Sequence, residues 1–305
     1  MKKSPLVSII MNCRNSDRFL RQAIDSVYDQ TYQNWELIFW DNVSRDNSAS
    51  IAQSYDNRTK YFLAENKTSL GEARNLALEK VKGKYVCFLD CDDLYVPDKL
   101  EKQVKMMEEN NYALSYGSAL IIDENNKVIR KFPAKNNSGY IFEELLKHYE
   151  INMQSVILRY SFLVKEQLNF LTSMQYCPDH NLFMQIAAYK QIGVEKDYIV
   201  KYRVLRDSLS AETIKLAGPE VRLTLDKIGH CFPELSLRFK QQFKLAYSKC
   251  NYYDAIAAIH DHDYQAAQGL LRSLISLRYE YLGLYLILFL PLPKKLVLKL
   301  LNRYI

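Results

Sequence analysis

The chain has 305 residues, of which 48% are hydrophobic and 25% are charged, and its formal net charge is +6. These values exclude a disordered chain and allow one large domain or two smaller ones. The mild positive charge fits anionic partners such as phosphates, acidic lipids or nucleic acid, and selects none of them.

The first part of the chain alternates between predicted strands and helices. Apolar runs at residues 6–11 and 35–40 are typical of buried strands, and each ends in a polar turn. Apolar residues at three- and four-residue spacings predict a helix from Asp17 to a point before Tyr32. Further helices are predicted around 51–55 and 73–81, with a short strand at 61–63 between them. This order predicts right-handed βαβ crossovers and an α/β fold with a mostly parallel central sheet and flanking helices.

Two common phosphate-binding fingerprints are absent from the sequence. No G-x-G-x-x-G follows the first predicted strand, and no G-x-x-x-x-G-K-[ST] occurs. The patterns of dinucleotide-binding dehydrogenases and of P-loop NTPases are therefore excluded.

Three carboxylates, Asp90, Asp92 and Asp93, directly follow a short apolar run at 85–89 that is typical of a buried strand. Because side chains alternate along an extended segment, Asp90 and Asp92 are expected to share a side and to hold one cation. Carboxylates suit Mg²⁺ or Mn²⁺, and the phosphates of a substrate would complete the coordination. The alternative is that these acids cap the next helix, which Pro97 would open, and the residues alone leave both interpretations open.

The sequence from residue 99 to 210 continues with mixed elements. Helices are predicted at 99–107, 141–148 and 182–189, and strands at 112–122, 128–132, 155–159 and 199–204.

Asp179 lies in the first turn of the helix that Pro178 opens. It is expected either to stabilise that helix by about 0.3–1 kcal/mol through the dipole or to act as a general base, with His180 as a second candidate. Arg203 and Arg206 either clamp a phosphate or are solvated.

The C-terminal part has a different character. Near Pro219 the alternation gives way to helical, leucine- and tyrosine-rich sequence, so we expect a first domain at 1–218 and a helical region at 219–305, including a helix pair within 253–277. The pattern at 294–303 predicts a basic amphipathic helix that lies on an anionic membrane or packs on protein, including a second copy of the chain in a homodimer. Basic residues are otherwise spread out, so no nucleic-acid partner is expected.

The location of the protein is predicted from its cysteines and apolar segments. Six cysteines occur without a CxxC pair or a zinc-site spacing, as is typical of reduced cytoplasmic thiols. The apolar run near the N-terminus ends at Asn12 and Arg14, too early for a secretory signal, and no apolar segment reaches the ~20 residues that a spanning helix needs. We therefore expect a cytoplasmic protein, associated peripherally with the inner face of the cell membrane if the tail binds lipid.

Several segments together resemble the inverting glycosyltransferases of family 2, which have a GT-A (Rossmann-like) fold. The likeness runs from residue 6 to 210 and is carried, in order, by LVSIIMNCRN, RFLRQAIDSVYDQTYQNWELIFWDNVSRDNS, LGEARNLAL and GKYVCFLDCDDLYVPDKL. The resemblance implies a nucleotide-sugar donor, expected to be a UDP-sugar, and a glycan or lipid-linked acceptor, as in surface polysaccharide biosynthesis.

The resemblance also implies roles for matched residues. Asn12 and Asp41 would contact the base and ribose, and Arg74 would belong to the donor site. Asp90 and Asp92 would be the D-x-D pair that carries Mn²⁺ or Mg²⁺ against the diphosphate. Asp179 would be the base that deprotonates the acceptor hydroxyl.

The sequence departs from the family pattern at three places. Pro178 replaces the glutamate that precedes the catalytic aspartate, and Asn42 replaces the second aspartate of the D-D-G-S turn. Leu205 stands at the histidine position of the late Y-R-x-H-x-x-S loop, where Arg203 or Arg206 would have to supply the missing contact.

Two other functions share some of the sequence features expected of sugar transfer. A sugar-phosphate nucleotidyltransferase also needs a metal and a parallel sheet, but NCRNSDR lacks the glycines expected of its phosphate loop. A non-catalytic nucleotide-sugar-binding scaffold would not need intact acids at positions 90, 92 and 179. Metal-assisted, inverting sugar transfer is therefore the expected activity.

Overall fold

The computed structural model describes residues 4–205, 213–275 and 280–289. The chain divides into two compact units, Met1–Leu145 with Tyr149–Arg206, and Leu146–His148 with Asp207–Ile305. The boundary predicted near Pro219 lies inside helix α9 (Ala217–Cys231), after this division. The change in composition therefore coincides with the first long helix of the second unit.

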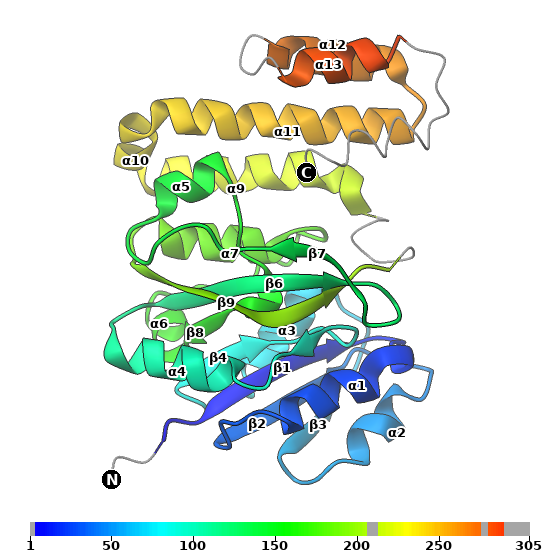
Figure 1. The fold of residues 1–305 in the computed structure, drawn as a ribbon, viewed down its shortest axis with the longest axis vertical. Coiled ribbons are helices and arrows are strands. Elements are labelled where there is room, and N and C mark those ends of the chain that lie inside the picture. The colour runs from blue at the N-terminus through cyan, green and yellow to red at the C-terminus, as the bar shows by residue number, and fades with distance from the viewer. Residues whose placement is uncertain (1–3, 206–212, 276–279, 290–305) are drawn as a thin grey trace. The chain divides into compact units, whose positions relative to one another are not determined.

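Nine strands of the described chain form one sheet in the first unit (Figure 1). They are β1 Val7–Cys13, β2 Trp35–Asp41, β3 Thr59–Leu63, β4 Tyr85–Phe88, β5 Leu94–Tyr95, β6 Leu114–Ile122, β7 Val128–Phe132, β8 Ile157–Arg159 and β9 Ile192–Arg203. Their order is β3-β2-β1-β4-β8-β6-β9-β5, and β7 pairs with β6.

The predicted α/β class is confirmed, but the sheet is mixed where a mostly parallel one was expected. Strands β3, β2, β1 and β4 are parallel, whereas β8 is antiparallel to both β4 and β6. A buried strand has the same apolar pattern in either direction, so the sequence did not reveal the orientation of β8. The short strand β5 was not predicted, and β9 begins at Ile192, well before the predicted residue 199.

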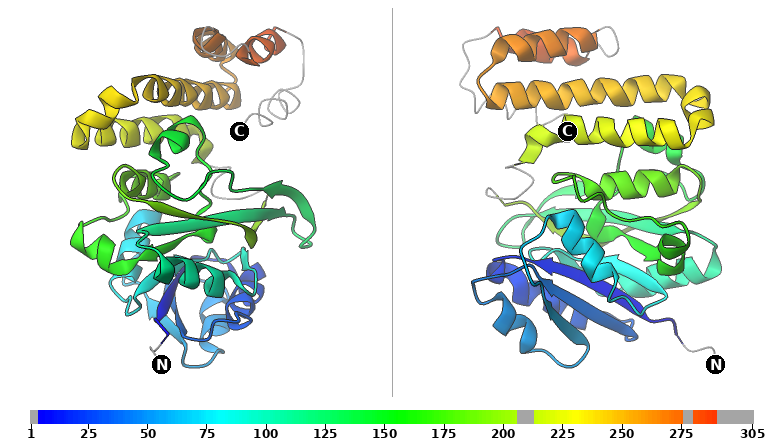
Figure 2. Two further views of the ribbon diagram at one scale, coloured as in Figure 1. Left: turned by 60° about the vertical axis from the view of Figure 1, so that its left-hand side comes forward. Right: turned by 180° about the vertical axis from the view of Figure 1, so that it is seen from behind.

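The helices of the first unit are α1 Asp17–Tyr28, α2 Ser48–Gln53, α3 Leu70–Leu78, α4 Lys99–Glu109, α5 Phe142–Lys147, α6 Tyr160–Lys165 and α7 Pro178–Ala187, with the 3-10 turn η1 Met153–Ser155, and α5 continues into the second unit. Helices α1 and α4 lie on one face of the sheet, which is turned toward the viewer in Figure 1. Helix α3 lies on the other face, which the right-hand view of Figure 2 shows from behind.

Alternation along the strands explains this layering. Every second residue of β1, including Ile9 and Met11, packs in one cluster with Leu20 of α1 and Leu100 of α4. Ser8 and Ile10, which point to the opposite face, are also buried, because α3 and its neighbours cover that face. Strands buried on both faces read as continuous apolar runs, which is why the sequence predicted them.

The second unit is helical in its described part. It contains η2 Ile214–Leu216, α9, α10 Pro233–Arg238, α11 Lys240–His260, α12 Tyr264–Ile275 and α13 Glu280–Ile287. Apolar residues of α11 and α12, including Tyr252, Ile259 and Leu271, form its core, so the predicted helix pair is confirmed. Within the described ranges, no helix combines the length and the apolar character needed to cross a membrane. The predicted amphipathic segment 294–303 lies outside the described residues.

Candidate active site

The three acids after β4 form a tight turn at the end of the strand. The backbone N–H of Asp93 donates to the carbonyl of Asp90 at 3.2 Å, so the segment turns and the prediction of an extended segment is wrong. Helix α4 begins at Lys99 after Asp98. The acids therefore lie outside the cap position of α4, which removes the alternative of simple helix capping.

Burial and mutual repulsion make this turn electrostatically costly. Burial, with the charge of Asp90, raises the pKa of Asp92 to about 6. Burial and the charges of Asp92 and Asp90 raise the pKa of Asp93 well above its ordinary value. Like charges gathered in this way bind a cation or a proton more readily than isolated carboxylates do.

Arg203, at the end of β9, forms hydrogen bonds that hold the acidic turn in place. Its backbone N–H donates to Asp93 Oδ1 at 2.6 Å, and its Nε donates to the carbonyl of Asp92 at 2.7 Å. Its Nη1 and Nη2 donate to the carbonyl of Asp123 at 2.9 Å and to Asn126 Oδ1 at 2.8 Å. The residue is only 2% exposed. Arg203 is thus engaged by protein acceptors, which differs from the predicted phosphate clamp, and Arg206 lies outside the described residues.

Asp90 connects the turn to two buried side chains. Its Oδ1 lies 3.8 Å from Nη2 of Arg74, a residue of α3 whose side chain is 5% exposed. The guanidinium also lies over the ring of Phe170, and its Nη1 is buried without a hydrogen-bond partner among the described residues. On its other oxygen, Asp90 Oδ2 accepts a hydrogen bond of 2.6 Å from Gln154 of η1.

Asp179 lies in the first turn of α7, as predicted, and faces the same charges. Burial raises its pKa, and the negative charge of Asp90 adds to this effect. The positive charge of Arg74 and the backbone N–H groups at the start of α7 oppose it. Asp90, Arg74 and Asp179 therefore lie within electrostatic reach of one another although they come from three separate parts of the chain. The second candidate, His180, is buried, with its ring 4.5 Å from that of Tyr149.

The carboxyl ends of β1 and β2 carry the predicted nucleotide-contacting residues. Asn12 Nδ2 is buried without a hydrogen-bond partner in the described part of the chain. Asp41 is 1% exposed and accepts from the backbone N–H of Ser44 at 2.7 Å and from the Tyr61 hydroxyl at 2.8 Å. Asn12 therefore has a free donor, whereas both carboxylate oxygens of Asp41 already have protein partners.

Asn42, a departure from the family pattern, has a structural explanation. Its Nδ2 donates to the carbonyl of Thr68 at 3.0 Å, and its Oδ1 accepts from the backbone N–H of Thr68 at 3.0 Å. An amide can both donate and accept in this way, whereas an ionised aspartate can only accept. Asn42 thus joins the turn after β2 to the segment before α3.

Residues 8–172 match the family described as Glycosyl transferase family 2. The chain belongs to this family. It is 34% identical over 227 residues to the Escherichia coli UDP-Glc:alpha-D-GlcNAc-diphosphoundecaprenol beta-1,3-glucosyltransferase WfgD, over 73% of this chain and 85% of that protein. The protein is therefore a glycosyltransferase.

Two solved structures share the fold of this family 2 glycosyltransferase. One is S. aureus TarS in complex with UDP-GlcNAc, with a TM-score of 0.59 at 16% identity, covering 87% of this chain and 83% of that one. The other is the mannosyltransferase PcManGT from Pyrobaculum calidifontis in complex with GDP-Man and Mn2+, with a TM-score of 0.60 at 17% identity, covering 99% and 88%. These likenesses confirm the predicted GT-A fold.

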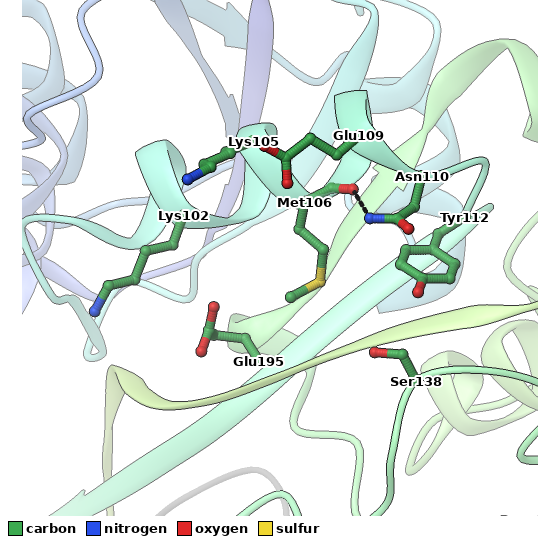
Figure 3. A pocket seen from close by; sticks show the side chains of 8 residues that line it. All are labelled: Lys102, Lys105, Met106, Glu109, Asn110, Tyr112, Ser138 and Glu195. Carbon is green, nitrogen blue, oxygen red and sulfur yellow. Dashed lines mark hydrogen bonds between the residues drawn. The ribbon is translucent and has the colours of Figure 1, made fainter.

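A separate surface cavity of about 370 Å³ contains none of the predicted site residues of this glycosyltransferase (Figure 3). It is lined by Lys102, Lys105, Met106, Glu109, Asn110, Tyr112, Ser138 and Glu195. Lys102 is paired with Asp98 and Asp197, and Asn110 donates to the carbonyl of Met106. Of its charged side chains, Lys102 is therefore engaged with the protein itself.

Two contributors to the site were missed in the sequence. Gln154 lies between the polar residues Asn152 and Ser155 in a segment without a clear pattern, and Phe170 is an aromatic residue in a segment without periodicity. Neither has a spacing that marks it as functional. Only their contacts with Asp90 and Arg74 in the folded chain reveal them.

Proposed function

We propose that this glycosyltransferase moves a sugar, with inversion, from a UDP-sugar to a hydroxyl of a lipid-linked or glycan acceptor, in surface polysaccharide biosynthesis. The observation that carries the proposal is the convergence of Asp90, Arg74 and Asp179 beside the acidic turn. Such a cluster at the carboxyl end of a strand is where open α/β sheets bind ligands.

The donor assignment is supported by the relatives and by one side chain. The E. coli relative is named for UDP-Glc and for a diphosphoundecaprenol acceptor, and the TarS structure contains UDP-GlcNAc. The free amide donor of Asn12 suits a carbonyl of a pyrimidine base. PcManGT contains GDP-Man, so a GDP-sugar is the competing donor to be tested.

Inversion is supported by the linkage in the name of the E. coli relative. That enzyme is named as a β-1,3-glucosyltransferase acting with UDP-Glc. Formation of a β linkage from an α-linked nucleotide sugar requires the acceptor oxygen to attack opposite the leaving group. A base on the acceptor side and positive charge on the diphosphate side are the two requirements of such a displacement.

The acidic turn has a donor set that fits a divalent cation only together with a substrate. Across the described ranges, no group of three or more His, Cys, Asp or Glu side chains could hold a metal. Asp90 and Asp92 would supply at most two carboxylates, and Mg²⁺ or Mn²⁺ is commonly bound by one or two carboxylates plus phosphates and water. When bound there, the cation would supply positive charge to the diphosphate oxygens as the sugar leaves.

Asp179 is assigned as the general base. It would accept the proton of the acceptor hydroxyl while the acceptor oxygen forms its bond to the anomeric carbon and the bond to the diphosphate breaks. The charge of Arg74 favours the ionised form of Asp179 against the effect of burial. Arg74 also supplies a fixed cation beside Asp90, so we assign the donor-site role to Arg74 and a positioning role to Arg203.

Peripheral binding to an anionic membrane is part of the proposal, because the acceptor is expected to be lipid-linked. Leu282, Leu286 and Phe289 are 43%, 54% and 58% exposed, and the first two lie one turn apart on α13. The chain continues from there into the basic, leucine-rich sequence 294–303. Apolar and basic residues in succession are suited to a headgroup layer. A homodimer through the same residues is the competing proposal.

A thermal-shift screen tests the donor site directly. UDP, GDP and their sugars would be added to the full-length protein with and without Mn²⁺. We expect UDP with Mn²⁺ to stabilise the fold, by about 2.7 kcal/mol at a hundredfold excess over Kd. Stabilisation by GDP alone would revise the donor, and no stabilisation by any nucleotide would contradict the proposed site.

A further inference from the structure

Gln154 holds Asp90 through both ends of its side-chain amide. The backbone N–H of Asp90 donates to Gln154 Oε1 at 2.8 Å, and Gln154 Nε2 donates to Asp90 Oδ2 at 2.6 Å. Gln154 is 2% exposed, so water does not compete for these bonds. The two bonds link the main chain and the carboxylate of the same residue.

The orientation of this amide follows from its partners. A backbone N–H can only donate, so the oxygen of Gln154 must face the nitrogen of Asp90, and its NH₂ group must face the carboxylate. One carboxylate oxygen, Oδ2, is therefore occupied. The other, Oδ1, lies on the side of Arg74 at 3.8 Å, and the Asp90 side chain is 41% exposed.

Gln154 is itself fixed by a chain of buried contacts. The Asn152 side chain accepts from the backbone N–H of Gln154 at 3.0 Å at the start of η1. Gln103 of α4 donates to the carbonyl of the next residue, Ser155, at 2.8 Å, and Lys99 donates to Gln103 at 2.8 Å. All of Lys99, Gln103 and Ser155 are fully buried. Gln154 therefore has little freedom to follow a displaced carboxylate.

We propose that Gln154 is a positioning residue that fixes the Asp90 carboxylate, so that Oδ1 is presented to the cation, which in turn binds the donor diphosphate. This inference rests on the proposed metal-assisted function. Partners that orient a metal-binding carboxylate typically contribute about 10- to 100-fold to metal affinity. Without Gln154, the Asp90 carboxylate would rotate among its rotamers, and neither of its oxygens would be held in one position for the cation.

The test compares two buried glutamines of the full-length protein. Gln154→Met removes both amide bonds at nearly constant volume. Gln30→Met is the matched control, because Gln30 is 1% exposed and also bonds through both ends, to the carbonyl of Val96 at 2.9 Å and the N–H of Leu100 at 3.1 Å, without touching a carboxylate. Mn²⁺ binding in the presence of UDP is measured by electron paramagnetic resonance of free Mn²⁺, and folding by thermal melting.

We expect both variants to melt at lower temperature and only Gln154→Met to weaken Mn²⁺ binding, by about 10- to 100-fold. Gln154→Asn, whose amide is one methylene shorter, carries the same expectation if the methionine variant does not fold. An unchanged Mn²⁺ Kd in a folded Gln154 variant, or equal weakening in Gln30→Met, would overturn the positioning role. Absence of Mn²⁺ binding by the wild-type protein would instead overturn metal assistance, and this inference with it.

Discussion

The backbone N–H of Arg203 donates to Asp93 Oδ1 at 2.6 Å across 110 residues of sequence. This bond joins the end of β9 to the turn that follows β4. The Arg203 side chain adds bonds to the carbonyls of Asp92 and Asp123 and lies over the ring of Phe19. The acidic turn is thus held by Arg203 on one side and by Gln154 on the other.

Replacement of Arg203 by lysine should destabilise the fold. Lysine cannot reach the several acceptors that the guanidinium satisfies, and removal of one partner of a buried charged network costs about 3 kcal/mol or more. The free energy of unfolding measures this, with Arg130→Lys on the exposed strand β7 as a control expected to change it by less than about 0.5 kcal/mol. Unchanged stability with a raised KM for the donor would restore the phosphate clamp expected from the sequence.

Asp92→Asn should reduce transfer while stabilising the metal-free fold. Loss of a carboxylate that we propose to bind the cation is expected to lower kcat/KM about 100-fold or more, since charge stabilisation by a metal contributes several kcal/mol. Because the pKa of Asp92 is about 6 in the folded protein against an ordinary 3.8, the folded state binds the extra proton between these values. Wild-type stability should therefore fall as pH rises through this window.

Asp92→Asn should not lose stability as pH rises through this window, and at neutral pH its free energy of unfolding should exceed that of the wild type by about 1–3 kcal/mol. Urea unfolding at several pH values in EDTA gives the comparison. A parallel pH dependence in wild type and Asp92→Asn would show that the buried charge of Asp92 is not its cause.

Asp179→Asn should lower kcat by about 10²- to 10⁴-fold and leave donor binding unchanged, because a general base acts on the acceptor in the transition state. Burial raises the pKa of Asp179, so the acidic limb of the wild-type rate should lie above the pH expected of an ordinary aspartate. Steady-state rates across pH check both points. Full activity of the variant, or a changed donor KM with unchanged kcat, would assign Asp179 to helix stabilisation or donor binding.

Removal of residues 290–305 should weaken binding to vesicles that contain phosphatidylglycerol. The segment carries Lys294, Lys295, Lys299 and Arg303, and each basic residue near an anionic surface contributes about 1 kcal/mol. Co-sedimentation at low and high salt measures the loss, and neutral phosphatidylcholine vesicles are the control. If binding persists after truncation while the protein changes from dimer to monomer, the segment belongs to a homodimer interface.

The sequence predicted the placement of those candidate-site residues that lie at strand ends. Asn12, Asp41 and Asp90 follow apolar runs, and parallel neighbours β2, β1 and β4 bring their carboxyl ends to one edge of the sheet. The location of Asp179 relative to these residues could not be predicted from the pattern, because periodicity indicates only that Asp179 lies at the start of a helix. Its proximity to Asp90 was implied by the family resemblance and depends on long-range packing.

Other features were not readable because they depend on single contacts. An arginine at a strand end has the same pattern whether it is solvated or, like Arg203, buried against carbonyls. The segment at Asp90 was expected to be extended. It is a turn, and a run of acids does not reveal the 3.2 Å hydrogen bond that closes it. Gln154 had no pattern at all, since its function depends on a partner 64 residues away.

The most direct test of the account is sugar transfer by the wild-type protein and two single-site variants. The assay supplies a panel of UDP-sugars, a polyprenyl-diphosphate-linked acceptor and Mn²⁺, and measures both UDP release and the anomeric configuration of the product. We predict acceptor-dependent UDP release with an inverted linkage in the wild type, and loss of both in Asp92→Asn and Asp179→Asn. Equal transfer by all three proteins, or a product with retained configuration, would contradict the account.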